Sequence, residues 1–249
     1  MPGTLYGVGV GPGDPELITL KGLKLIQRSP VVAFPAGLGD KPGVAQRIIA
    51  DWLTPAQTQL PLTFPYVQDE TTLTQAWAAA AEQVWPILKG GQDVTFVSEG
   101  DISFYSTFTY LAQTLQHRHP EVTIQAVPGI CSPMAAAAVL GIPLTVQAQR
   151  LMVLPALYTV ADLETALTQA DIVVLMKVSS VYAQVWPVLQ RRGVLSTSYV
   201  VERAMMPGQT IYADLSDRPQ LTLHYFSILI VQTQTRMIES TGLITAAQV

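Results

Sequence analysis

The sequence predicts an α/β protein with two α/β domains, each built on a sheet of roughly five strands. Short apolar strands alternate with helical segments through the first half of the chain. A Val-Pro-Gly-Ile turn at 127–130 then precedes a second series of strands and helices. The chain has 249 residues, 49% of them hydrophobic and 13% charged, which suits substantial cores and argues against disorder. We therefore place the domains at 1–127 and 128–249.

The first predicted domain alternates strands and helices. Its strands are expected at 5–10, 30–35, 58–62, 93–98 and 122–126. Its helices are expected at 15–24, 44–53, 69–88 and 104–116. Asp14 and Pro15 suit the N-cap and first position of the first helix, and Pro61 favours an edge position for its strand. The alternation predicts a mainly parallel sheet that is covered on both faces.

The second predicted domain ends differently. Its strands are expected at 150–154, 171–176, 196–203, 209–214 and 224–232. Its helices are expected at 132–139, 161–169 and 180–190. The last three strands follow one another without a helix, which predicts an antiparallel end to this sheet.

The stretch 99–107, Glu-Gly-Asp-Ile-Ser-Phe-Tyr-Ser-Thr, is the leading candidate for a functional loop. A buried strand ends before it, the chain turns at Gly100, and a helix is expected to begin with Ser103 as its N-cap. Ligands of open α/β sheets bind at the carboxyl ends of strands. No structural role is evident for Asp101, so it is a candidate binding residue, although an ordinary capped turn explains the local pattern equally well.

Composition and charge exclude several classes of function. The net charge is −4 and no run of Lys or Arg is present, which argues against a nucleic-acid partner. The single Cys131 leaves no disulfide and no thiolate cluster for zinc, and His117 and His119 are expected at the surface. The uncharged segment 122–149 is broken by Pro and Gly, so we expect no membrane span. With no signal peptide recognised, a cytoplasmic protein is expected.

Common catalytic and nucleotide-binding motifs do not match. Counting from Gly7 or Gly9, the third glycine of a G-x-G-x-x-G motif is replaced by Pro12 or Asp14. A P-loop and a G-x-S-x-G nucleophile elbow are also missing. The glycine-rich loops with few acid or base groups favour a reaction in which the reagent is already activated and the protein binds and aligns it. No catalytic residue is assigned.

Five segments resemble the tetrapyrrole (corrin/porphyrin) methyltransferase superfamily in their order along the whole chain. They are VGPGDPELITLKG at 10–22, EGDISFYSTF at 99–108, VPGICSPMAAAAVLGIPL at 127–144, VVLMK at 173–177 and ERAMMPGQTIY at 202–212. The F-Y-S-T-F run is most similar to the branch that methylates carbon 20 of precorrin-2 or cobalt-factor II in cobalamin biosynthesis. The resemblance implies S-adenosylmethionine as cofactor in a cleft between the two domains, S-adenosylhomocysteine as product, and no protein-bound metal.

The resemblance also implies which residues contact the cofactor. The matching positions are Pro12, Glu99, Gly100, Asp101, Phe104, Tyr105, Ser106, Cys131, Ser132, Met176, Ala204, Met205 and Tyr225. Two departures from the wider superfamily stand out: Ile102 replaces a frequent proline, and Cys131-Ser132 replaces a frequent Thr-Ala pair. Contacts made by the backbone would survive both changes.

The implied partner is a tetrapyrrole that carries many carboxylates, so local cations are expected to meet it. The candidate substrate-binding residues are Asp14, Arg150, Lys177 and Arg203. A homodimer is expected from the family. Two alternatives stay open: a superfamily methyltransferase acting on another corrin carbon or on a ribosomal or protein substrate, and a non-catalytic tetrapyrrole-binding protein.

Overall fold

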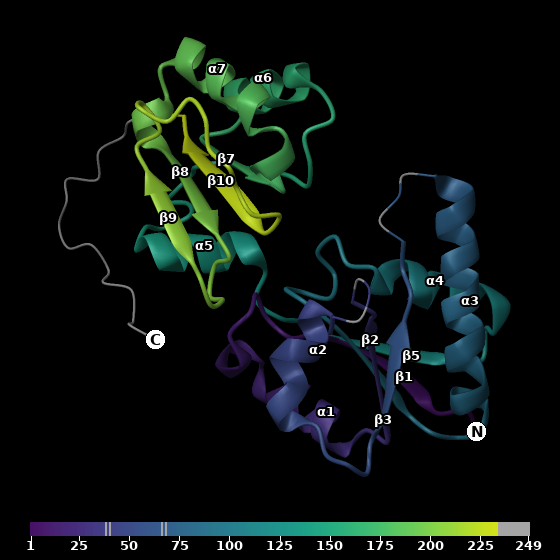
Figure 1. Ribbon diagram of the computed structural model, residues 1–249. Helices are drawn as coiled ribbons and strands as arrows, with labels where there is room; N and C mark the ends of the chain where they lie inside the picture. The colour runs from purple at the N-terminus through teal and green to yellow at the C-terminus, as the bar shows by residue number, and fades with distance from the viewer. Residues whose placement is uncertain (38, 40, 66, 68, 234–249) are drawn as a thin grey trace. The chain divides into compact units, whose positions relative to one another are not determined.

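The computed structural model describes residues 1–37, 39, 41–65, 67 and 69–233 (Figure 1). The chain divides into two compact units, and the second begins at Ser132. Whether independently folding domains divide after Val127 stays a prediction.

The first unit is built on a five-stranded sheet. Its strands are β1 Thr4–Gly9, β2 Val31–Pro35, β3 Thr58–Leu62, β4 Val94–Ser98 and β5 Thr123–Val127. The strand order is β3-β2-β4-β1-β5 and every pairing is parallel. β4 is central and wholly buried, whereas β3, which contains Pro61, is an edge strand. The parallel sheet and the edge position of β3 confirm the sequence prediction.

Helices cover both faces of this sheet (Figure 1). They are η1 Pro15–Leu17, α1 Leu20–Arg28, α2 Val44–Ile49, η2 Ala50–Trp52, α3 Glu70–Lys89 and α4 Phe108–Arg118. α1 and α2 pack against one face with Val8 and Val32, and α3 and α4 pack against the other with Leu5 and Phe96. The two clusters are the hydrophobic core of the unit.

The strand order creates a switch point between β4 and β1. The connection from β1 leads towards β2, whereas the connection from β4 leads the opposite way to β5. Right-handed crossovers in opposite directions place the following helices on opposite faces, so the two loops diverge at the carboxyl ends of these strands. Gly11 and Gly100 lie in these loops.

Two predicted helices differ from the structure. The helix expected over 15–24 is interrupted, because Asp14 caps only the short η1 and Thr19 then caps α1 by accepting a hydrogen bond from the Gly22 N–H. The helix expected from 104 begins at Phe108 after the N-cap Thr107, so Ser103 is not its N-cap. In both places, more than one short polar residue suits a helix N-terminus, and the helix begins after the later one.

The second unit contains another five-stranded sheet. Its strands are β6 Leu151–Leu154, β7 Ile172–Met176, β8 Ser198–Glu202, β9 Thr210–Ala213 and β10 Ser227–Gln232, in the order β6-β7-β10-β8-β9. β6 and β7 are parallel, and the other three pairings are antiparallel, which confirms the predicted antiparallel end. The strand expected from 224 begins only at Ser227.

The helices of the second unit also lie on both faces of its sheet (Figure 1). They are α5 Ser132–Leu140, α6 Val160–Gln169, η3 Val178–Ser180, α7 Tyr182–Arg192 and η4 Leu195–Thr197. α5 packs with Val174, Val201 and Ile230 on one face, and α6 and α7 pack on the other. In the part of the chain that the structure describes, no helix is both long and apolar enough to span a bilayer.

Gly7 allows α4 to pack closely on the first sheet, and replacing it tests this contact. A Cβ built on Gly7 would lie 2.4 Å from the Phe108 ring, which is buried and stacked on Phe96 at 5.8 Å between centroids. We expect Gly7→Ala to lower the free energy of unfolding by about 2 kcal/mol through overpacking, measured by chemical denaturation.

Gly193→Ala is the matched control. Gly193 has a φ of +68° and open space around its Cβ position, so backbone strain of about 1 kcal/mol is its main expected cost. An equal loss in the two variants would contradict a packing role for Gly7.

Candidate functional site

The backbone joins the loops that follow β1 and β4. The Gly11 N–H donates to the Gly100 carbonyl at 3.1 Å, and the Gly100 N–H donates to the Gly11 carbonyl at 2.7 Å. Both glycines have positive φ, +82° and +73°, a conformation that side chains disfavour. The switch point is therefore closed by a pair of backbone hydrogen bonds.

A third loop, which follows β5, packs against this pair. A Cβ on Gly9 would lie 2.7 Å from the Gly100 oxygen and 2.8 Å from the Gly129 nitrogen, and a Cβ on Gly129 would lie 2.3 Å from the Gly100 oxygen. Main-chain atoms cannot swing aside as a flexible side chain does. Glycine at positions 9 and 129 is thus what lets the three loops meet.

Asp101 links the second and third loops through its carboxylate. One oxygen accepts from the Ser103 N–H at 2.8 Å and the Ser103 hydroxyl at 2.5 Å, and the other accepts from the Gly129 N–H at 2.8 Å. Partial burial alone would raise the pKa of the Asp101 carboxyl, but the hydrogen bonds from Ser103 and Gly129 outweigh it and lower the pKa. The expectation that Asp101 lacks a structural role was wrong.

The segment 104–106 is an irregular turn. Tyr105 has a φ of +53° and a side chain that is 58% exposed, and its ring lies edge-on to Phe104 at 4.7 Å between centroids. The buried Ser106 hydroxyl accepts from the Phe108 N–H at 3.2 Å, so it supports the start of α4. The turn presents an aromatic side chain at the carboxyl edge of the sheet.

The other predicted residues of the first unit lie in or beside the same three loops. Pro12 is buried, Glu99 is exposed directly after β4, and Cys131 is half-buried after the β5 loop. Asp14 accepts from the Glu16 N–H at 2.8 Å, so this carboxylate caps η1. The structure thus brings the predicted residues of the first unit together at one edge.

In the second unit, the strand register brings another set of predicted residues to one end of the sheet, where β7 and β8 finish. Met176 pairs with Ile228, and Glu202 pairs with both Ser227 and Thr210, so the ends of β7 and β8 lie beside the start of β10. Lys177 follows β7, and the segment 203–205 follows β8. Tyr225 lies two residues before the first residue of β10 and is 46% exposed.

Backbone strain is concentrated in these loops. Among the described residues, six that are not glycine have positive φ, and four of them are predicted site residues: Tyr105, Lys177, Arg203 and Met205. Such conformations cost roughly 1–3 kcal/mol each and persist where surrounding contacts determine them. Lys177 and Arg203 have no carboxylate within ion-pair distance among the residues described.

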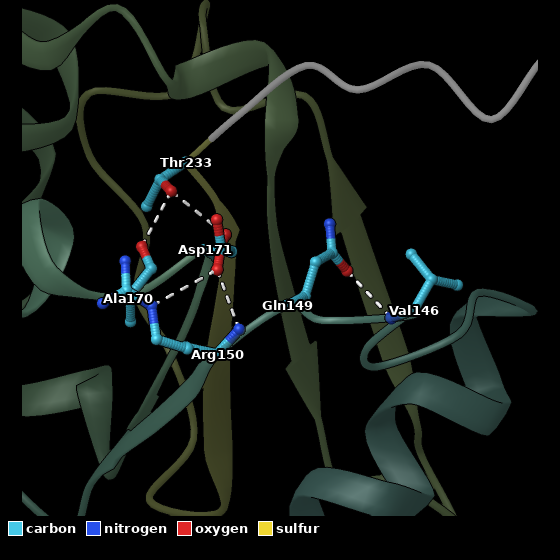
Figure 2. Close-up of polar contacts among 6 residues, drawn as sticks. All are labelled: Val146, Gln149, Arg150, Ala170, Asp171 and Thr233. Carbon is cyan, nitrogen blue, oxygen red and sulfur yellow. Dashed lines mark hydrogen bonds and ion pairs between the residues drawn. The ribbon is translucent and has the colours of Figure 1, made fainter.

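Arg150 is placed apart from the other cations. It precedes β6, whose first residue Leu151 pairs with Ile172 at the start of β7. Lys177 follows the other end of β7. Figure 2 shows its backbone N–H donating to the Asp171 carboxylate at 2.8 Å, and its side chain lies 3.8 Å from the same carboxylate. The structure therefore does not bring Arg150 together with Lys177 and Arg203.

The histidines do not form a metal site in the described part of the chain, where no cluster of three candidate ligands occurs. The His119 ring instead stacks on Trp85 at 3.8 Å between centroids. His224 donates its backbone N–H to Glu202 at the end of β8. Sequence reasoning did not select either residue for the site. A carboxylate at the end of a buried strand is a signal that could have drawn attention to Glu202. Its contact with His224 joins distant parts of the chain, so the sequence did not reveal that contact.

The chain belongs to the family of tetrapyrrole (corrin/porphyrin) methylases, whose model matches residues 4–218. It is 34% identical to the cobalamin biosynthesis protein CobIJ of Mycobacterium tuberculosis over 96% of this chain and 48% of that protein. The chain thus spans about half the length of this relative. It is 32% identical to a precorrin-2 C(20)-methyltransferase of Sinorhizobium over 92% of this chain and 95% of the relative.

Two further similarities extend over nearly the whole chain. The cobalt-precorrin-2 C(20)-methyltransferase of Salmonella typhimurium is 30% identical over 96% of this chain and 100% of its own length. The crystal structure of a cobalt precorrin-4 methyltransferase, CbiF, superposes with a TM-score of 0.70 at 25% identity, covering 92% of this chain and 94% of that one. The two five-stranded sheets with their helices are therefore the fold of this family.

Asp101→Asn tests the carboxylate link between the loops. An amide can still accept from Ser103, but its NH₂ group would face the Gly129 N–H, so we expect a loss of about 1 kcal/mol in the free energy of unfolding at pH 7. Because the folded-state pKa is lowered, the carboxylate stabilises the fold above its unfolded pKa, near 3.8, and this contribution is lost as the pH falls through the folded pKa. Denaturation at pH 7 and at successively lower pH should show the wild-type advantage shrinking below about pH 4.

Ser103→Ala serves as a control that keeps the Gly129 contact. It removes only the hydroxyl donor to Asp101, so we expect a smaller destabilisation than in Asp101→Asn. A wild-type advantage over Asp101→Asn that does not change with pH would argue against the carboxylate as its source.

Proposed function

We propose that this protein transfers a methyl group from S-adenosylmethionine to carbon 20 of precorrin-2 or cobalt-factor II in cobalamin biosynthesis. The relatives from Sinorhizobium and Salmonella support this substrate, because their similarity extends over at least 92% of this chain and at least 95% of each relative. A crystal structure of uroporphyrin-III C-methyltransferase from Thermus thermophilus with S-adenosylhomocysteine shares the fold at a TM-score of 0.65 and 22% identity.

The observation that carries the proposal is the meeting of three loops at the switch point of the first sheet. Gly9 and Gly129 let the three backbones approach closely, and Gly100 and Gly129 are only half-buried, which suits close contact of main-chain atoms with a ligand. Glu99 adds an exposed carboxylate next to this pair, and carboxylates accept hydrogen bonds from ribose hydroxyls and attract cations. An exposed carboxylate at this place suits a cationic adenosyl sulfonium and would repel a phosphate.

The protein's part in the reaction is to bind and align. When bound, S-adenosylmethionine supplies an electrophilic methyl group on a positively charged sulfur. We assign its binding to the loops around Pro12, Glu99–Ser106 and Cys131-Ser132, together with Met176, Ala204, Met205 and Tyr225. The strained but firmly bonded loops hold these positions before a ligand arrives, which lowers the cost of orienting the reactants. No side chain is assigned as an acid or base.

Lys177 and Arg203 are the proposed contacts for the substrate carboxylates. They follow β7 and β8 at one edge of the second sheet, and neither is engaged by a described carboxylate. Local cations of this kind allow a protein with a net charge of −4 to bind a polyanion. Arg150 is not included, because Asp171 contacts it at the other edge. We further propose that the enzyme works as a cytoplasmic homodimer.

A paired assay tests the reaction. Purified protein and S-adenosylmethionine are incubated with metal-free precorrin-2 in one reaction and cobalt-factor II in another, and the tetrapyrrole is analysed by mass spectrometry and NMR. We expect one added methyl group at carbon 20 in at least one reaction. A methyl group at another carbon would assign a different member of the family, and bound cofactor without any transfer would favour a tetrapyrrole-binding role.

Lys177→Met tests the proposed substrate contact. Loss of one partly solvated charge partner is worth about 1 kcal/mol, so we expect the tetrapyrrole Kd to rise about fivefold while the Kd for S-adenosylhomocysteine stays unchanged. Lys89→Met is the control, because Lys89 is an exposed residue in the last turn of α3, which leads to the opposite end of β4. Equal tetrapyrrole affinities in the two variants would remove Lys177 from the substrate site.

A further inference from the structure

A buried carboxylate lies at the end of the second sheet that carries the proposed cofactor-binding residues. Glu202, the last residue of β8, is only 8% exposed. One carboxylate oxygen accepts a short hydrogen bond from the His224 backbone N–H, and the other accepts from the Tyr212 hydroxyl at 3.1 Å. Burial and the hydrogen bond to Glu202 raise the pKa of Tyr212, so its hydroxyl stays a donor at neutral pH.

The same carboxylate begins a chain of contacts that closes on itself. The His224 Nδ1 accepts from the Phe226 N–H at 3.2 Å, and the Phe226 carbonyl accepts from the Arg203 N–H at 2.7 Å. Arg203 follows Glu202 directly in the sequence. We call Glu202, His224 and Phe226 the edge clamp, because together they join the end of β8 to the segment before β10.

The edge clamp makes a hydrogen bond to the backbone of one proposed cofactor-binding segment and flanks the other. Arg203 and Met205 have φ values of +49° and +59°, and the Arg203 N–H bond to Phe226 lies within this strained turn. Tyr225 lies between the two clamp residues His224 and Phe226. Burying a carboxylate costs free energy, and apolar residues often fill such a place with equal or greater stability. The polar arrangement therefore points to a requirement for local geometry.

We infer that Glu202 and His224 are positioning residues for the proposed methyl transfer, which hold Ala204, Met205 and Tyr225 in the conformation that binds the cofactor. They act through the backbone and are not expected to touch the reacting atoms. The inference rests on the proposed function, since it concerns the binding of S-adenosylmethionine and S-adenosylhomocysteine.

The experiment compares two replacements of His224 by measuring the Kd for S-adenosylhomocysteine calorimetrically, with a melting temperature for each protein. His224→Leu removes the acceptor for the Phe226 N–H. His224→Asn restores one, because an Asn side chain commonly accepts from the N–H two residues further on. We expect the Kd to rise about tenfold or more in His224→Leu and to stay within about threefold of wild type in His224→Asn.

Thr233→Val is the control for a general loss of stability. The Thr233 hydroxyl donates to the Ala170 and Asp171 carbonyls at the opposite edge of the same sheet (Figure 2). We expect this variant to bind S-adenosylhomocysteine as wild type does, even if its melting temperature falls. Tyr212→Phe provides a second, milder test, because it removes one donor to Glu202 and keeps the ring; its Kd should rise about threefold.

The outcomes separate the inference from the function on which it rests. Equal affinities of wild type, His224→Leu and Tyr212→Phe would overturn the inference and leave the proposed cofactor intact. An equal loss in His224→Asn and His224→Leu, or in Thr233→Val, would also overturn it. A wild-type protein that does not bind S-adenosylhomocysteine at all would overturn the proposed function and, with it, the role of the edge clamp.

Discussion

The two hydrogen bonds between Gly11 and Gly100 join loops that begin about 90 residues apart in the sequence. They form at the switch point of a parallel sheet, where strand order already brings β1 and β4 side by side. Gly129 then fits against the pair because neither it nor Gly9 carries a Cβ. Asp101 completes the arrangement by bonding both its own turn and the third loop. The placement of Pro12, Glu99, Tyr105 and Cys131 follows from this assembly.

In the second unit, irregular loops at the strand ends are also held in place, but by side chains. Its edge is assembled from parallel and antiparallel strands, so the start of β10 lies beside the ends of β7 and β8. Side chains replace the glycine contacts here: Glu202 and His224 bond to the backbone and hold a turn with positive φ at Arg203 and Met205. In both units the irregular backbone lies at the ends of strands, and the buried apolar strands that precede it provide a rigid support.

Local patterns predicted the architecture well, because strands and helices depend on periodicity and on nearby glycine and proline. Strand 58–62 and the antiparallel end of the second sheet were predicted from such signals and confirmed. The start of α4 was misplaced, since Ser103, Ser106 and Thr107 all suit a helix N-terminus. The Ser103 hydroxyl donates to Asp101 instead, and Ser106 accepts from the first helical N–H. The hydrogen bonds from the Gly129 N–H to Asp101 and from the His224 N–H to Glu202 join distant segments, so the sequence carried no local signal for them. Family resemblance selected most of the proposed cofactor contacts, whereas the local pattern had already singled out Asp101.

Because main-chain atoms form much of the proposed first-unit site, several of its contacts do not depend on side-chain identity. The departures at Ile102 and Cys131-Ser132 alter side chains while the glycine contacts beside them stay closed. A scan that truncates side chains to alanine would therefore miss these main-chain contacts. Adding a single methyl group at Gly9 or Gly129 is the more informative perturbation, and comparisons among relatives should weigh glycine positions above the chemistry of their neighbours.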